Sequence, residues 1–142
     1  EPRSFAIADQ YSLLEWHGIE QHAVHGSYRW SGPHVRSGID LPVVVDRPVA
    51  VRVTLINRIM HEVLAGLAIE VAGRRVATRV SGGPNDSTLI DFELPFATGE
   101  TPRQGLLVTL VVPYVKRPCD LGINDDERWL GVAVTSVEVR PA

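Results

Sequence analysis

Cysteine is almost absent from this 142-residue sequence, which contains only Cys119. One thiol excludes an internal disulfide and a metal cluster built on cysteines, so nothing in the sequence requires an oxidising compartment. No apolar run approaches the roughly 18 residues that a membrane-spanning helix needs, and no basic-then-apolar signal segment opens the chain. We therefore expect a cytoplasmic domain that does not insert into membranes.

Positive charge is also scarce. The sequence has 14 Lys and Arg residues against 17 Asp and Glu residues, which gives a formal net charge of -3 at pH 7. Nucleic acids and anionic membranes generally attract proteins with basic surfaces, so neither is an expected partner. Hydrophobic residues make up 44% of the sequence and charged residues 22%, proportions that are typical of a soluble globular domain.

The length corresponds to one domain. A folded chain of this size buries roughly two thirds of its unfolded surface, which is enough for a core without disulfides. Residues 1–13 have mixed polarity and no sustained period, so we interpret them as a lead-in or linker and place the folded domain in residues 14–142. Glu1 is not a natural first residue, so we expect the domain to come from a larger protein.

The 12 glycines and 10 prolines fall between short apolar segments, which is typical of turns that separate strands. Only residues 59–67 have a helical pattern, and that stretch is too short for a core helix. Eight or nine strands predict an all-β fold, a two-sheet antiparallel β-sandwich that is jelly-roll-like. The expected extended segments are residues 14–20, 27–30, 38–45, 49–57, 67–71, 75–80, 88–94, 106–115 and 129–140.

Several local patterns refine this prediction. Residues 49–57 alternate in hydrophobicity with the two-residue period of a strand that has one buried face. Residues 72–74 separate two extended segments, which indicates a hairpin. The apolar run 106–115 indicates a central strand covered on both sides. Pro42 predicts an edge or a bulge, and a phase shift near residues 135–136 predicts a β-bulge.

Five histidines raise the question of a metal site, because neutral imidazole is a good ligand for zinc, copper and iron. His17, His22 and His25 mix odd and even positions, so one strand face does not present all three. The sequence also lacks the His-x-His and Glu-x-x-His patterns of known metal sites. We favour surface histidines with no metal or cofactor, and keep a jelly-roll metal site as a less favoured alternative.

Catalytic groups are equally sparse. Cys119 lies in no recognised motif, and the sequence has neither a Gly-x-Ser-x-Gly elbow nor a glycine-rich phosphate loop. Glu15 and Glu20 would lie on opposite faces of a regular strand, which does not suit the paired carboxylates of glycosidases. Ion pairing with Arg128 and turn capping explain the acidic residues of 120–127 better than calcium does, because the EF-hand spacing is missing. We therefore expect no enzyme activity.

Four of the nine aromatic residues lie in the first and last expected strands: Trp16, Tyr28, Trp30 and Trp129. Sugar rings stack on flat aromatic side chains, and each of these tryptophans has a charged neighbour that could bind hydroxyl groups. Exposed aromatics would therefore suit carbohydrate binding. The alternative is that the tryptophans fill the core where the first and last strands pair.

Two stretches of the chain resemble a known family. The early stretch is WHGIE at residues 16–20 with GSYRWS at 26–31, and the late stretch is RPCDLGINDDER at 117–128 with LGVAV at 130–134. They resemble the β-sandwich accessory domains attached to bacterial glycosyltransferases that build cell-surface polysaccharides. The resemblance spans residues 14–139. It implies a jelly-roll-like sandwich without catalysis, a carbohydrate-binding or scaffolding role, and a carbohydrate or the glycosyltransferase catalytic domain as partner.

The resemblance and the aromatic pattern together give a set of expected ligand-binding residues. A structural interpretation of the same residues also stands, in which Glu20 and Arg29 meet Asp126 and Arg128 in a partly buried ion network between the first and last strands. A docking or oligomerisation domain without a ligand remains the other alternative. The expected ligand-binding residues are Trp16, Glu20, Arg29, Trp30, Asp126, Arg128 and Trp129.

Overall fold

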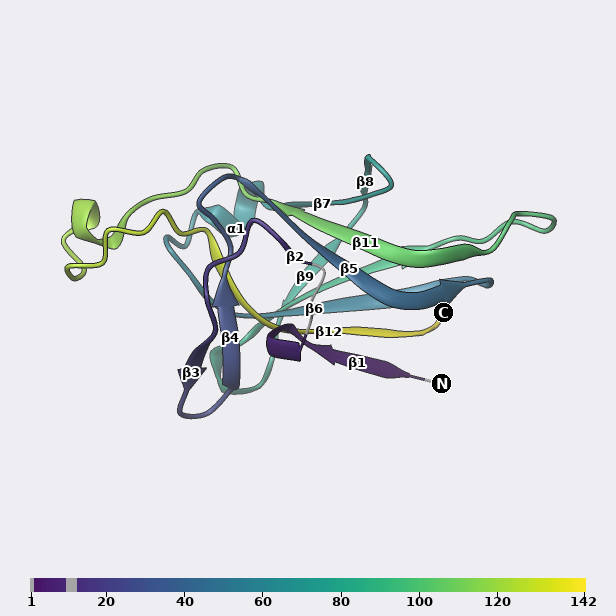
Figure 1. The fold of residues 1–142 in the computed structure, drawn as a ribbon, viewed down its shortest axis with the longest axis horizontal. Coiled ribbons are helices and arrows are strands. Elements are labelled where there is room, and N and C mark those ends of the chain that lie inside the picture. The colour runs from purple at the N-terminus through teal and green to yellow at the C-terminus, as the bar shows by residue number, and fades with distance from the viewer. Residues whose placement is uncertain (1, 10–12) are drawn as a thin grey trace.

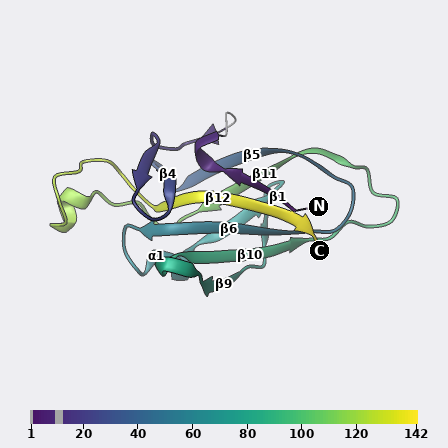
Figure 2. The same ribbon diagram turned by 90° about the horizontal axis from the view of Figure 1, so that it is seen from below.

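The computed structural model describes residues 2–9 and 13–142. Two antiparallel sheets pack face to face, which confirms the predicted all-β sandwich (Figures 1 and 2). Twelve strands are present in these residues, more than the eight or nine expected, because several strands are only two to four residues long. No helix of the described residues is long and apolar enough to span a membrane.

The larger sheet has the strand order β3-β4-β12-β6-β10-β9, with β1 paired to β12, and the smaller sheet has the order β2-β5-β11-β7-β8. The larger sheet contains β1 (Arg3–Ala6), β3 (Glu20–His22), β4 (Gly26–Trp30), β6 (Val49–Arg58), β9 (Arg79–Gly82), β10 (Thr88–Leu94) and β12 (Val132–Pro141). The smaller sheet contains β2 (Leu13–Leu14), β5 (Arg36–Val45), β7 (Ala68–Val71), β8 (Arg74–Val76) and β11 (Arg103–Val111). The helical turns are η1 (Ile7–Asp9), α1 (Val63–Gly66), η2 (Pro84–Asp86) and η3 (Pro118–Leu121).

The core lies between the sheets and follows the predicted alternation. In β6, Val49, Val51, Val53 and Leu55 are buried, while the residues between them are half-buried on the outer face. β6 lies between β12 and β10 (Figure 2). Its apolar side chains therefore pack at the centre of the sandwich, where burial of one such side chain contributes about 1.5–3 kcal/mol.

The predicted irregularities are also present. The register between β12 and β6 shifts between Val134 and Ser136, which confirms the bulge. The register between β5 and β11 shifts opposite Pro42, since Leu41 pairs with Leu106 but Val44 pairs with Gln104. Residues 72 and 73 both have positive φ and close the hairpin between β7 and β8. Such a left-handed pair is the geometry of the tight turns that suit twisted strands.

Other expected segments are wrong in part. Residues 14–20 do not form one strand, because Glu15 has a φ of 64° and interrupts the run between β2 and β3. Residues 75–80 are split because the chain leaves the smaller sheet after β8 and enters the larger one at β9. The expected strand 106–115 ends earlier, because β11 ends at Val111. It is also not covered on both sides: the sandwich has only two layers, so the outer face of β11 is open and Leu107 is 40% exposed. The expected lead-in, residues 1–13, contains β1, and this strand pairs with β12 of the larger sheet.

A long connection between β11 and β12 extends from one end of the sandwich and carries η3 at its tip (Figure 1). β1 begins and β12 ends at the opposite end. Lys116 and Leu130 exchange backbone hydrogen bonds of 3.1 and 2.9 Å at the base of the connection. This connection, residues 112–131, contains most of the late motif and is called the η3 loop below.

Candidate functional site

The early and late motifs lie against each other at the end of the sandwich that carries the η3 loop. β4 pairs with β12 through Trp30 opposite Ala133 and Arg29 opposite Val134. Ser31 extends this contact, because its backbone N–H donates to Val132 O at 2.7 Å and its hydroxyl accepts from Val132 N at 2.9 Å. The expected pairing of the first and last parts of the domain is therefore confirmed.

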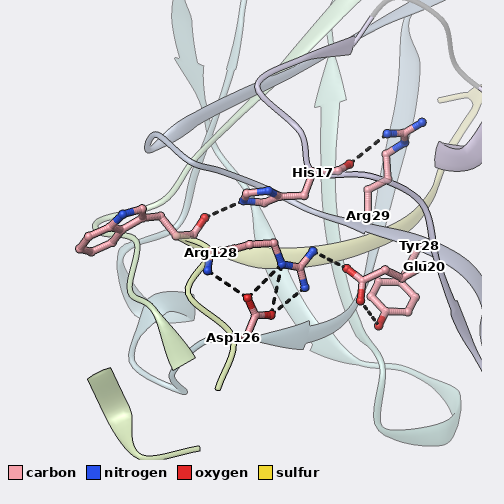
Figure 3. Close-up of polar contacts among 7 residues, drawn as sticks. His17, Glu20, Tyr28, Arg29, Asp126 and Arg128 are labelled. Carbon is pink, nitrogen blue, oxygen red and sulfur yellow. Dashed lines mark hydrogen bonds and ion pairs between the residues drawn. The ribbon is translucent and has the colours of Figure 1, made fainter. Parts of the chain in front are cut away.

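Arg128 is the centre of an ion network that joins the two motifs (Figure 3). Its Nη1 donates to Glu20 Oε2 at 2.8 Å, and its Nη2 donates to Asp126 Oδ2 at 2.8 Å. These bonds hold the pKa of the Asp126 carboxyl below its ordinary value. They also raise the pKa of Arg128, which stays charged. The predicted network of Glu20, Asp126 and Arg128 is confirmed.

Tyr28 extends the network from β4. Its hydroxyl donates to Glu20 Oε1 at 3.3 Å. Burial raises the pKa of the Tyr28 phenol, and the negative charge of Glu20 raises it further. The phenol is therefore protonated at neutral pH and serves as a donor. With this bond, both oxygens of Glu20 are engaged.

Arg29 does not join the network, and that part of the prediction is wrong. Its Nη1 donates to His17 O at 2.9 Å (Figure 3). Successive side chains of a strand point to opposite faces, so Arg29 points away from the face that Tyr28 and Trp30 share. Its Nε is buried and has no hydrogen-bond partner among the described residues.

The three tryptophans have different environments. Trp30 is 8% exposed and belongs to the core. Trp16 is half-buried, packs against the core and donates from Nε1 to Gly38 O at 2.9 Å. Trp129 is 44% exposed, and the Arg117 guanidinium lies 5.2 Å from the centre of its ring. Trp16 and Trp30 therefore have the packing that the core interpretation describes, and Trp129 is the exposed one of the three, with Arg117 over one face of its ring.

A pocket of about 340 Å³ lies between the strands of the larger sheet and the η3 loop. Four of the expected residues line it, namely Glu20, Trp30, Asp126 and Arg128. The full set of lining residues is Glu20, Tyr28, Trp30, Asn57, Arg58, Ile59, Pro118, Ile123, Asn124, Asp126, Arg128 and Leu130. Residues distant in the sequence thus line one open pocket whose walls combine apolar surfaces with charged and amide groups.

Sequence reasoning missed Asn57 and Arg58 at the end of β6, and Asn124 in the η3 loop. One signal was present, because polar residues follow the alternating run of β6 at the point where the strand ends. Asn57 Oδ1 accepts from Arg58 N at 2.9 Å, and Asn124 Oδ1 accepts from Asp126 N at 2.8 Å. Both amides are therefore oriented by a backbone N–H group.

His17, expected to be a surface histidine without a special role, links the two motifs through a bond to a backbone oxygen. Its Nε2 donates to Trp129 O at 2.8 Å (Figure 3). Gly32 lies in the same contact at a φ of 132°, and a Cβ atom there would lie 2.1 Å from Trp129 O. Only glycine fits this backbone approach.

Two other histidines, His22 and His25, lie in the hairpin formed by β3 and β4. His22 Nδ1 accepts from Val24 N at 3.0 Å and from His25 N at 3.2 Å. His25 Nε2 donates to Asn85 O at 2.9 Å. Within residues 2–9 and 13–142, no group of three or more His, Cys, Asp or Glu residues is placed to hold a metal ion.

Comparison with known proteins gives a fold but no family. No known family and no curated protein matches the sequence. Among solved structures, the chain is similar to a family 35 carbohydrate-binding module from Clostridium thermocellum, with a TM-score of 0.52 and 13% identity over 100% of this chain and 99% of that one. It is also similar to 17% of the chain of a family 115 4-O-methyl-α-glucuronidase with specificity for decorated arabinogalactans, with a TM-score of 0.55 and 13% identity over 99% of this chain. These similarities show a shared β-sandwich.

Proposed function

We propose that this chain is a non-catalytic carbohydrate-binding module and that the pocket between the larger sheet and the η3 loop holds the sugar. The observation that carries the proposal is that residues of the early and late motifs line one cavity of about 340 Å³. Ligand pockets generally have volumes of about 300–1,000 Å³ and combine apolar walls with a few oriented polar groups. The names of the two similar structures, a carbohydrate-binding module and an enzyme that acts on glycans, agree with this function.

The proposed binding mode differs from the expected stacking of a sugar ring on Trp16 and Trp30. The apolar wall of the pocket includes Ile59, Ile123 and Leu130, against which the C–H face of a sugar ring can pack. The ion network of Arg128 holds the η3 loop next to β3 and β4, so the pocket is preorganised before a ligand binds. Trp129 lies outside the lining residues, and its exposed ring can add a contact at the rim with a longer glycan.

The wider setting is also a proposal, and the resemblance of the two motifs supports it. In this proposal the module works in the cytoplasm beside a glycosyltransferase catalytic domain in bacterial polysaccharide synthesis. It would hold the growing glycan near the transferase, so that the acceptor is present at high effective concentration.

Binding to an array of bacterial surface glycans, followed by calorimetry on the retained glycans, tests the function. Ile123 lines the pocket and is 60% exposed, so Ile123→Asp places an unpaired carboxylate in the wall with little effect on folding. Val24 is 62% exposed and does not line the pocket, so Val24→Asp is the matched control. We expect the first variant to lose glycan affinity and the second to keep it. Equal affinities would place the glycan elsewhere.

A docking function is the second candidate, and the surface of the η3 loop favours it. Leu121, Ile123 and Trp129 are 37%, 60% and 44% exposed on this protruding segment. Exposed apolar groups of this kind mark protein interaction sites when they are contiguous. Leu121→Ser separates the functions, because docking requires this exposed side chain and Leu121 does not line the pocket.

A further inference from the structure

The carboxylates of the pocket are already bonded to donors of the protein. Glu20 accepts from Tyr28 and Arg128 through its two oxygens. Asp126 Oδ1 accepts from Arg128 Nε at 3.1 Å, and Asp126 Oδ2 accepts from Arg128 Nη2 at 2.8 Å. Arg128 therefore directs its guanidinium to the protein itself.

The two amides of the pocket leave only their N–H groups unused. Asn57 Oδ1 faces the backbone N–H of Arg58, and Asn124 Oδ1 faces the backbone N–H of Asp126. An amide oxygen must face an N–H donor, so these bonds determine which way each amide is turned. The Nδ2 groups of both residues form no hydrogen bond within the described part of the chain, and each retains two donors.

Arg58 is the cation of the pocket that has no carboxylate partner among the described residues. Its guanidinium has one side-chain contact there, from Nη2 to His61 Nδ1 at 3.4 Å. Most of its five N–H donors are unused. Arg58 also follows Asn57 directly in the chain, and both line the same cavity as Asn124.

We propose that the pocket selects a sugar with an anionic substituent, a carboxylate or a phosphate, which binds to Asn57, Arg58 and Asn124. This inference rests on the proposed carbohydrate function and names the ligand class. A carboxylate or phosphate offers acceptors without requiring acceptors in return, and it forms charge-assisted hydrogen bonds with arginine. A neutral hydroxyl accepts a weaker hydrogen bond from the same donors, because a bond in which both groups are charged is stronger than one to a neutral acceptor.

The pocket has no net charge that would attract an anion from a distance. Arg58 and Arg128 balance Glu20 and Asp126, so the charged lining residues sum to zero. Attraction of an anion therefore depends on the direct bonds from the three donor residues, and not on a general positive field. The loss of one of these donors should consequently remove much of the preference.

Calorimetry with matched sugars tests the inference. The probes are the methyl glycosides of glucose, galactose and mannose, the corresponding uronic acid glycosides, and the corresponding 6-phosphates. We expect at least one acidic sugar to bind about tenfold or more tightly than its neutral counterpart, since a hydrogen bond to a charged group contributes about 1.5–3 kcal/mol. The uronic acid and phosphate arms distinguish the two sources of negative charge.

Three variants locate the effect. Asn57→Asp and Asn124→Asp keep the oxygen that accepts from the backbone and replace the free N–H donors with a negative charge, so the fold is retained while the preference is lost. Arg58→Gln should reduce the preference by about tenfold or more. Asp125→Asn changes a charge beside Asn124, and Arg74→Gln removes an exposed arginine outside the pocket, so both should bind like the unmodified protein.

Each result has a distinct meaning. A preference for an acidic sugar that disappears in the three pocket variants supports the inference. Equal binding of acidic and neutral sugars, or a preference that survives Arg58→Gln, overturns the inference and leaves carbohydrate binding in place. An array that retains only neutral glycans also overturns the inference and leaves carbohydrate binding in place. An array on which no glycan is retained overturns the proposed function and this inference together.

Discussion

Arg128 Nη1 donates to Glu20 Oε2 at 2.8 Å, a bond between residues that are 108 positions apart in the chain. The bond joins β3 to the η3 loop, and Asp126 holds the other side of the same guanidinium. Both carboxylates and the guanidinium are between a quarter and two fifths exposed. Water therefore weakens the network, but several charge-assisted bonds act together to position one wall of the pocket.

We predict that Arg128→Ala lowers the free energy of unfolding by about 1–2 kcal/mol, because two carboxylates lose their shared donor. Chemical denaturation measures this change. Arg47→Ala is the matched control, since Arg47 forms an exposed ion pair with its neighbour Asp46 and should be replaceable without measurable loss. Equal stability of the two variants would show that the network does not stabilise the fold.

Acid should weaken the same network. Hydrogen bonds from Arg128 lower the pKa of Asp126 in the folded state, whereas the unfolded chain has the ordinary value of about 3.9. The unfolded state therefore takes up the proton first as the pH falls. This stabilisation is fully present above about pH 5 and is lost as the pH falls through the lowered pKa.

Asp126→Asn should consequently flatten the acid side of the stability curve, measured as the free energy of unfolding at a series of pH values from 6 to 3. Asp125→Asn serves as the control, because Asp125 is exposed and forms no ion pair among the described residues. A curve for Asp126→Asn as steep as that of the unmodified protein would contradict the prediction.

Gly32→Ala should prevent stable folding or cost about 3 kcal/mol or more. The new Cβ atom would lie 2.1 Å from Trp129 O at a backbone φ of 132°, and the backbone on both sides of the contact would have to move. Gly18→Ala tests the specificity, since a Cβ atom at Gly18 meets no atom within 4 Å. Thermal unfolding of Gly18→Ala should therefore resemble that of the unmodified protein, and a similar loss in both variants would contradict the explanation.

The tryptophans should differ sharply in their contribution to stability. Trp30→Ala removes a core side chain that is 8% exposed, and we expect a loss of about 3–5 kcal/mol. Trp129 is 44% exposed, so Trp129→Ala should change the free energy of unfolding by less than about 1 kcal/mol. Denaturation of both variants checks the order, which would be reversed if Trp129 were the packed residue.

The parts of the fold that local patterns control were predictable. The alternation in residues 49–57 identified the buried face of β6, because the period of a strand is a property of the strand itself. The phase shift in β12 located its bulge for the same reason. The pairing of first and last strands expected of a jelly roll brought Glu20 near Arg128 before any distance was known.

The missed features depend on contacts between distant segments. Glu15 has a left-handed backbone conformation with a φ of 64°, and this breaks the expected first strand. Glycine usually marks such a conformation in a sequence, and this position has none. Asn57 and Arg58 became candidates only when the η3 loop was placed beside the end of β6. Arg29 is a different case, because the alternation of the expected strand 27–30 already turns it away from Tyr28, and the prediction did not apply that alternation.

The most direct test of carbohydrate binding in this pocket is a titration of nitrogen-15-labelled protein with the glycan that the array retains. We expect the side-chain amide signals of Asn57 and Asn124 to shift, together with the indole signal of Trp30, while the side-chain amide signals of Gln21 and Gln104 outside the pocket remain fixed. Saturable binding that leaves the signals of Asn57 and Asn124 unchanged would contradict a sugar site between the larger sheet and the η3 loop.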